Sequence, residues 1–171
     1  MAVLGSAEPG SEAFHMAEEA GRLLARLGIT VVSGGGSPAT RVAAERAMEA
    51  GGVVVGVIPT DDLAQHPPCT VLIPCGMGDA RNLIMALAGD AALVIGGRAG
   101  TLSEVCLAWL HRRPLLPLTG CGGWSDRLMT DPPDERGLSP ILPWSNIEQL
   151  EAALRGLGLV SSSPLATGGS S

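Results

Sequence analysis

The chain has 171 residues and a net charge of −6, and hydrophobic residues make up 46% of it while aromatic residues make up only 2%. A chain of this length fits one domain whose core is built from Val, Leu, Ile and Ala. The acidic balance argues against binding to nucleic acid or to an anionic membrane surface. The sequence contains no lysine, which excludes a lysine Schiff base with pyridoxal phosphate and a P-loop nucleotide hydrolase.

The cysteines do not indicate a metal site. Cys69, Cys75, Cys106 and Cys121 lack the close paired spacing of zinc ligands. His66 precedes Cys69 by three residues, but two candidate ligands in a proline-rich loop are too few. The sequence therefore predicts no metal and no cofactor. The N-terminus has no basic segment followed by an apolar one, so we expect a cytoplasmic protein with reduced thiols and no membrane partner.

Short apolar runs alternate with helical patterns along the chain. Strands are predicted at residues 2–4, 29–32, 53–58, 70–73, 91–95 and 114–118, with an edge strand at 138–142 because of its prolines. Helices are predicted at 11–27, 38–50, 79–88, 102–109 and 147–154. Residues 120–124 are predicted to form a loop, and 125–137 to be irregular at least in part. We expect one domain over 1–155 and a flexible tail over 156–171.

Three polar residues are expected to begin helices. Ser11 and Ser37 are suitable N-caps, and Pro38 suits the first helical position. Asp79 is the expected cap of the helix that follows Gly76.

The alternation predicts an α/β fold: a Rossmann-like, doubly wound, mainly parallel sheet with helices on both faces. Ligands of such folds bind at the carboxyl ends of the strands. Small residues follow several predicted strands, at Gly5-Ser6, Ser33-Gly34-Gly35-Gly36, Pro59-Thr60 and Gly96-Gly97-Arg98-Ala99-Gly100-Thr101. Each glycine turn alone is also compatible with a tight connection, but their convergence on one edge favours a phosphate-containing ligand. The pattern is not the dinucleotide G-x-G-x-x-G fingerprint.

An ordered series of motifs between residues 2 and 124 resembles a known superfamily. The motifs are Ser33-Gly-Gly-Gly36, then residues 51–59, then Ala80-Arg-Asn82, then Gly-Gly-Arg-Ala-Gly-Thr-Leu-Ser-Glu104. They resemble the Rossmann-like LOG (Lonely Guy) proteins, which were long mislabelled as lysine decarboxylases. Within that superfamily the chain is most similar to the branch of molybdenum cofactor carrier proteins and uncharacterised bacterial members.

The resemblance implies a nucleotide site. LOG enzymes are phosphoribohydrolases that release a base from a nucleoside 5′-monophosphate, and their motif is P-G-G-x-G-T-x-x-E. In this chain Gly96 replaces the proline and Arg98 replaces the second glycine, while Arg81 matches an arginine that LOG enzymes place before a lysine. These departures put the cytokinin substrate in doubt. The arginine and the glutamate of the family motifs are both present.

The resemblance assigns catalysis to Arg81 and Glu104. The carboxylate of Glu104 would stabilise the cationic ribose or position water, and Arg81 would hold the phosphate or the departing base. Phosphate-binding candidates are Gly34, Gly35, Gly36, Gly96, Gly97, Gly100 and Thr101. Further candidates are Ser6, Asn82, Arg98 and Trp124, of which Trp124 is placed to stack on a base or to pack at the sheet edge.

Glu104 has a competing structural interpretation. Thr101-x-x-Glu104 has the spacing of a capping box, in which the glutamate bonds to the backbone of its own helix start. The spacing alone favours this cap, and the family resemblance favours the catalytic role.

Three functions follow as alternatives. The first is a nucleoside 5′-monophosphate phosphoribohydrolase, supported by Arg81 and Glu104. The second is a carrier of a phosphorylated cofactor such as the molybdenum cofactor, supported by Gly97-Arg98-Ala99. The third is DNA binding, which the acidic balance disfavours. Homodimers are common in the superfamily, so a homodimer is expected, with the 102–109 helix serving either the core or the interface.

Overall fold

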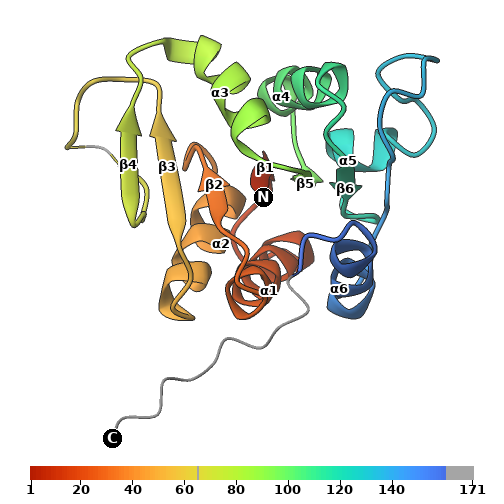
Figure 1. Ribbon diagram of the computed structural model, residues 1–171, viewed down its shortest axis with the longest axis horizontal. Helices are drawn as coiled ribbons and strands as arrows, with labels where there is room; N and C mark the ends of the chain where they lie inside the picture. The colour runs from red at the N-terminus through yellow and green to blue at the C-terminus, as the bar shows by residue number, and fades with distance from the viewer. Residues whose placement is uncertain (65, 161–171) are drawn as a thin grey trace, which may run out of the picture.

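In the described part of the chain, residues 1–64 and 66–160, six parallel strands form one sheet with helices on both faces (Figure 1). This computed structural model confirms the predicted α/β Rossmann-like class. The strands are β1 (Ala2–Ser6), β2 (Val31–Ser33), β3 (Val54–Ile58), β4 (Val71–Pro74), β5 (Ala92–Gly96) and β6 (Leu115–Pro117). The helices are α1 (Glu12–Arg26), α2 (Pro38–Glu49), α3 (Arg81–Ala88), α4 (Ala99–Leu110), α5 (Gly123–Arg127) and α6 (Ile147–Gly156).

The strand order is β4-β3-β2-β1-β5-β6. The chain moves outward from β1 to β4 and then returns to the other side of β1 as β5. The connections that leave β1 and β5 therefore go to opposite faces of the sheet. The carboxyl ends of these two adjacent strands mark the switch in strand order. A ligand crevice is expected at that point in open parallel sheets.

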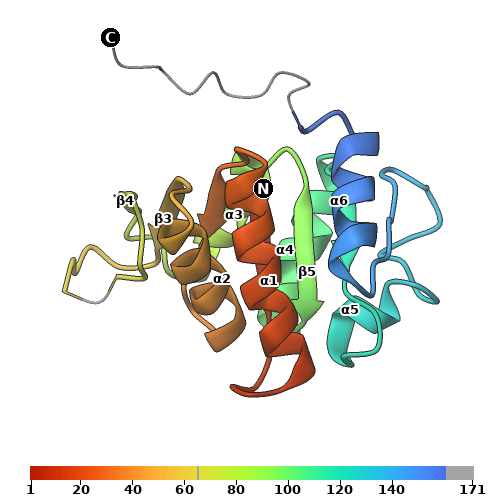
Figure 2. The same ribbon diagram turned by 90° about the horizontal axis from the view of Figure 1, so that it is seen from below.

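The two faces of the sheet are covered by different helices (Figure 2). Val3 of β1 packs in the core layer formed with α1, α2 and α6. Its neighbours Ala2 and Leu4 pack in the layer formed with α3 and α4. Successive strand side chains point to opposite faces, so a strand buried on both sides is apolar throughout. This explains the continuous apolar runs in the sequence.

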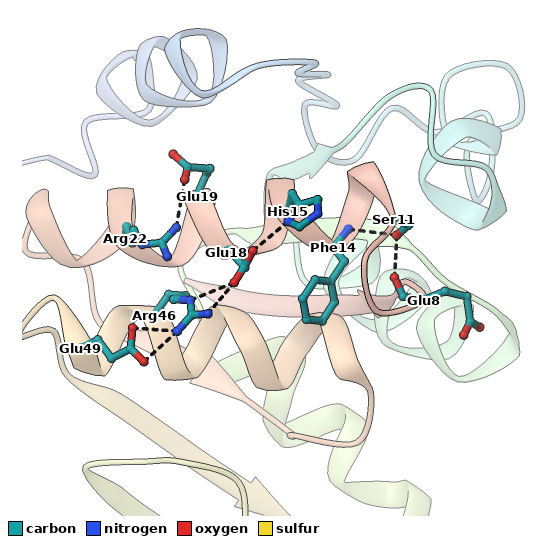
Figure 3. A network of polar contacts seen from close by, with 9 residues as sticks. All are labelled: Glu8, Ser11, Phe14, His15, Glu18, Glu19, Arg22, Arg46 and Glu49. Carbon is teal, nitrogen blue, oxygen red and sulfur yellow. Dashed lines mark hydrogen bonds and ion pairs between the residues drawn. The ribbon is translucent and has the colours of Figure 1, made fainter.

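Helices α1 and α2 approach each other closely through Gly21. A Cβ added at Gly21 would lie 2.2 Å from the carbonyl oxygen of Ala43. Arg46 of α2 donates to Glu18 of α1 at 2.7 Å and to Glu49 at 2.8 Å (Figure 3). These ion pairs link the two helices near the surface. The buried side chains between the helices and the sheet are mainly alanines, among them Ala17, Ala20, Ala43 and Ala47.

Two of the expected helix caps are confirmed. The Ser11 side chain accepts a hydrogen bond from the Phe14 N–H, and Ser37 forms a reciprocal capping box with Thr40. Asp79 is not a cap, contrary to the prediction. A short 3-10 turn, η1 (Gly78–Ala80), precedes α3, so the N-cap of α3 is Ala80, which has no side-chain acceptor.

Two further predictions need correction. The glycine-rich segment after β6 does not remain a loop, because residues Gly123–Arg127 form the short helix α5. The expected edge strand at 138–142 is reduced to single parallel bridges, Leu115 with Ile141 and Leu118 with Trp144. Pro140 and Pro143 lack the N–H groups that a continuous ladder needs.

The C-terminal end of the described chain packs on the domain. Helix α6 continues to Gly156, and Leu157, Leu159 and Val160 pack against the core layer of α1, α2 and α6. The remainder of the expected tail, residues 161–171, lies outside the described residues.

Candidate functional site

A cleft of about 280 Å³ opens at the carboxyl edge of the sheet, beside β1 and between the starts of α2, α3 and α4. We call it the Arg81–Glu104 cleft. It brings together nine of the residues singled out from the sequence: Ser6, Gly34, Gly36, Arg81, Asn82, Arg98, Gly100, Thr101 and Glu104. These residues belong to four separate segments of the chain, which meet here because the strands are parallel.

The guanidinium of Arg81, the first residue of α3, packs against the glycine loop that follows β2. Its Nη1 donates to the carbonyl oxygens of Gly34 at 2.7 Å and Val57 at 2.8 Å. The absence of side chains at Gly34 and Gly36 makes room for it, since a Cβ at Gly34 would lie 2.6 Å from Nη1 and one at Gly36 would lie 3.0 Å from Nη2. The loop therefore binds one edge of the guanidinium, and Arg81 lines the wall of the cleft.

Glu104, in the second turn of α4, is half-buried in the same cleft. Burial raises its pKa to about 7, and the positive charge of Arg81 opposes this rise. Among the described residues its carboxylate accepts no hydrogen bond. A carboxyl group that titrates near neutral pH in a cleft is a recognised sign of an acid–base site.

The capping-box interpretation of Glu104 is wrong. Helix α4 begins at Ala99, and its N-cap is Arg98, which makes no side-chain capping bond. Thr101 is therefore the third helical residue rather than the cap, and Glu104 lies too far along the helix to reach back to the helix start.

Helix α4 starts at the cleft without a side-chain cap, so among the described residues no side chain accepts from its first backbone N–H groups as a cap. Gly100 and Thr101 line the cleft. Gly97 has a φ of +100°, and a Cβ there would lie 2.5 Å from the Thr101 side chain, so glycine is required. Uncapped N–H groups and the helix dipole together favour an anion at this position.

Gly96 and Gly97 line a second cavity of about 550 Å³ on the α1 side of the sheet. We call it the α1 cavity, and it is bounded mainly by the start of α1 and the loop after β6. Ser6 and Arg98 line both it and the Arg81–Glu104 cleft. The Arg98 side chain is 88% exposed and lies 3.8 Å from the carboxylate of Glu8.

Two predicted residues lie outside both cavities. Gly35 faces the loop after β3, where an added Cβ would lie 2.2 Å from Pro67. Trp124 lies in α5 under the guanidinium of Arg127, which is 5.1 Å from its ring centre. Neither residue is among those lining the cavities. Asn82 lines the cleft and also donates from Nδ2 to the Ser103 hydroxyl at 3.3 Å, which links α3 to α4.

Sequence reasoning missed several lining residues. Ser37, Thr40 and Asp79 line the Arg81–Glu104 cleft, although the sequence indicated only capping roles for Ser37 and Asp79. The Ser37 hydroxyl donates to the carbonyl oxygen of Gly5 at 2.7 Å, which ties α2 to the end of β1. Ser37, Thr40 and Asp79 all come shortly after predicted strand ends, and this was the signal that could have identified them.

Within residues 1–64 and 66–160, no group of three or more His, Cys, Asp or Glu side chains is arranged to hold a metal ion. No helix among these residues has the length and apolar character needed to cross a bilayer.

Comparison with known proteins identifies the relatives of this chain. Residues 1–148 match the SLOG cluster4 family. The chain is 33% identical over 165 residues to a cytokinin riboside 5′-monophosphate phosphoribohydrolase of Mycobacterium tuberculosis, covering 92% of this chain and 78% of the relative.

Two solved structures are similar over nearly their whole length. The X-ray structure of TM1055 has a TM-score of 0.82 and 29% identity, covering 90% of this chain and 96% of that one. The molybdenum cofactor carrier protein of Chlamydomonas reinhardtii has a TM-score of 0.75 and 27% identity, covering 92% and 96%. The chain thus belongs to the SLOG cluster4 family, within the Rossmann-like superfamily that includes the LOG and molybdenum cofactor carrier proteins.

Proposed function

We propose that this protein binds a nucleoside 5′-monophosphate in the Arg81–Glu104 cleft and hydrolyses its N-glycosidic bond to free base and ribose 5-phosphate. The observation that carries the proposal is that Arg81 and the half-buried carboxyl group of Glu104 line the same cleft. Burial raises the pKa of Glu104 to about 7. The activity named for the Mycobacterium tuberculosis relative supports the same reaction class.

The anionic end of the nucleotide is proposed to bind at the start of α4. Gly100 and Thr101 contribute backbone N–H groups there, and Arg98 adds a positive charge at the rim. Charge-assisted hydrogen bonds of this kind are about twice as strong as neutral ones. Phosphate therefore fixes the nucleotide, and the sugar and base extend along the cleft.

In the proposed reaction, the carboxylate of Glu104 removes a proton from water as the water oxygen bonds to C1′ of the ribose. The C1′–N bond breaks, its electron pair stays on the base nitrogen, and the base takes up a proton. Positive charge develops on the ribose in the transition state, and the negative carboxylate stabilises it. We propose that Arg81, which Gly34 and Val57 hold by hydrogen bonds, binds the departing base.

The pKa of Glu104 suits this role. A general base works best when its pKa lies near the pH of the reaction, since it is then ionised and still basic enough to accept a proton. Burial achieves this for Glu104 by disfavouring the charged form, and the charge of Arg81 limits the effect.

The test is incubation of the full-length protein with a panel of nucleoside 5′-monophosphates, followed by chromatography of the free bases. A Glu104→Gln sample, prepared identically, controls for contaminating enzymes. Base release that is lost with Glu104→Gln supports the hydrolase and names its base. No release from any nucleotide by folded protein rejects it.

A second candidate function is a carrier that binds a phosphorylated cofactor without turnover. Arg98, in place of the second glycine of the LOG motif, favours this candidate. The molybdenum cofactor carrier protein of Chlamydomonas reinhardtii shares the fold at 27% identity. Retention of a molybdopterin-type compound through gel filtration, with no base release from nucleotides, is the result that selects the carrier.

We also propose that the protein is a cytoplasmic homodimer. Val105, Ala108 and Trp109 of α4 lie in the core, so this side of α4 serves packing. Leu83 and Leu87, one turn apart on α3, are 40% and 41% exposed and offer an apolar contact for a second copy. Light scattering of the wild type and of Leu87→Arg tests the assembly, and a wild-type monomer mass contradicts it.

A further inference from the structure

The Arg81–Glu104 cleft is small for the ligand it is proposed to hold. Its volume of about 280 Å³ lies just below the range of about 300 to 1,000 Å³ that is typical of small-molecule sites. The neighbouring α1 cavity, at about 550 Å³, is the larger space at this edge of the sheet. The proposed reaction leaves it unused.

The two cavities adjoin at one point of the fold. Ser6, at the end of β1, and Arg98, just after β5, line both. This is the switch in strand order, where one connection goes to each face of the sheet. A ligand at this junction is free to extend into the cleft on the α4 side and into the cavity on the α1 side.

The groups at the junction suit an anion. The exposed guanidinium of Arg98 lies there, and the left-handed backbone of Gly96 and Gly97 turns the chain into the uncapped start of α4. The proposed phosphate position at α4 is therefore at the middle of the combined space rather than at its end.

The α1 cavity itself suits an uncharged group with hydrogen-bond donors. Three of its hydroxyls are engaged within the protein: Ser11 donates to the carbonyl oxygen of Glu8, Thr119 to that of Trp144, and Ser145 to the Gln149 side-chain oxygen. The carboxylate of Glu8 lies 3.8 Å from Arg98, Glu12 offers a second carboxylate, and Met16 and Leu118 supply apolar surface. Amino or sugar hydroxyl groups of a ligand would donate to these carboxylates.

We propose that the natural ligand is a nucleotide whose phosphate is linked, directly or through pyrophosphate, to a second organic group that occupies the α1 cavity. The nucleoside lies in the Arg81–Glu104 cleft, the phosphate lies at Ser6 and Arg98, and the second group meets Glu8 and Glu12. This inference rests on the proposed function, because it places the cleavable nucleoside in the same cleft, and it extends the substrate class beyond monophosphates.

The experiment compares the binding of AMP with that of diadenosine pyrophosphate by calorimetry, and runs GMP and its pyrophosphate-linked dinucleotide in parallel. Ser145→Trp places an indole in the α1 cavity from an exposed position. Thr130→Trp, at another exposed site that lines neither cavity, is the matched control. For at least one base, we expect the linked compound to bind at least ten-fold more tightly than the monophosphate. Ser145→Trp should remove this advantage while leaving monophosphate affinity within two-fold, and Thr130→Trp should preserve it.

Two results overturn the inference while the proposed function stands: equal affinity for monophosphate and linked compound, or an advantage that Ser145→Trp does not reduce. If neither monophosphates nor linked compounds bind to the wild type, the nucleotide function itself is rejected and the inference falls with it.

Discussion

Arg81 and Glu104 face one cleft from two neighbouring helices. Burial raises the pKa of Glu104 to about 7, and the charge of Arg81 keeps this rise smaller than burial alone would make it. The two helices are also joined by the hydrogen bond from Asn82 to Ser103. The pair therefore combines a fixed cation with a carboxyl group whose charge changes near neutral pH.

The first prediction concerns the pH dependence of hydrolysis. If ionised Glu104 is the general base, kcat/KM should rise about ten-fold per pH unit below pH 7 and level off above it, because this parameter reports the free enzyme. Measurement of base release between pH 5 and 9 tests it. A profile that is flat across this interval argues against Glu104 as the base.

The second prediction concerns stability. Because the pKa of Glu104 is higher in the folded state than its ordinary value of 4.5, the folded protein binds more protons between these values, and the free energy of unfolding falls as pH rises through about 7. Glu104→Gln removes this effect. We expect the variant to be more stable than the wild type by about 1 to 3 kcal/mol at pH 8.

The same argument predicts that the stability difference disappears at pH 4, where Glu104 is protonated in both states. Urea unfolding of the two proteins at pH 4 and pH 8 measures it. A gain from Glu104→Gln that is equal at both pH values would assign the effect to packing rather than to the buried charge.

The third prediction concerns the contact of Arg81 with the glycine loop at Gly34. Gly34→Ala places a methyl group 2.6 Å from Nη1 of Arg81 and displaces the guanidinium, while the backbone at Gly34 needs no left-handed conformation. We expect base release to fall at least ten-fold, in line with the cost of misplacing a positioning group. The melting temperature should change little.

Gly156→Ala is the matched control for this variant, because nothing lies within 4 Å of its added Cβ. It should retain full activity. If Gly34→Ala also retains full activity, the position of Arg81 does not matter for the reaction.

The fourth prediction concerns the contact of α1 with α2. Alanine at Gly21 gains up to about 1 kcal/mol of helix propensity, but its Cβ would lie 2.2 Å from the backbone oxygen of Ala43. Relief requires the two helices to move apart, and overpacking of this kind costs about 1 to 3 kcal/mol. We expect Gly21→Ala to lower the urea midpoint of unfolding. An unchanged or higher midpoint would show that α2 moves away from α1 at little cost in stability.

Much of the architecture could be predicted from local sequence. The apolar run predicted as a strand at 91–95 lies within one residue of β5, which is covered on both faces, and Ser37 with Pro38 starts α2 as expected. These features depend on periodicity and on hydrogen bonds between residues close in the chain. Asp79 failed as a cap because the 3-10 turn before α3 placed Ala80 at the cap position.

The arrangement of the cleft required the tertiary structure. Two adjacent glycines, Gly35 and Gly36, differ in that Gly36 lines the cleft while Gly35 faces Pro67. Gly97 and Gly100 belong to one motif, yet they line different cavities. The side that a turn presents depends on its backbone angles and on loops that are distant in sequence, which no local pattern encodes.

The sequence by itself predicted the order of strands and helices and the convergence of the glycine turns on one edge of a parallel sheet, because these follow from periodicity and strand direction. The family resemblance singled out Arg81 and Glu104. Only the tertiary structure decided that α4 begins at Ala99, so that Glu104 turns into the cleft instead of capping its helix. The tertiary structure also set the pKa of Glu104. Its two causes, burial and the nearby charge of Arg81, arise from packing between α3 and α4, which join residues distant in the sequence.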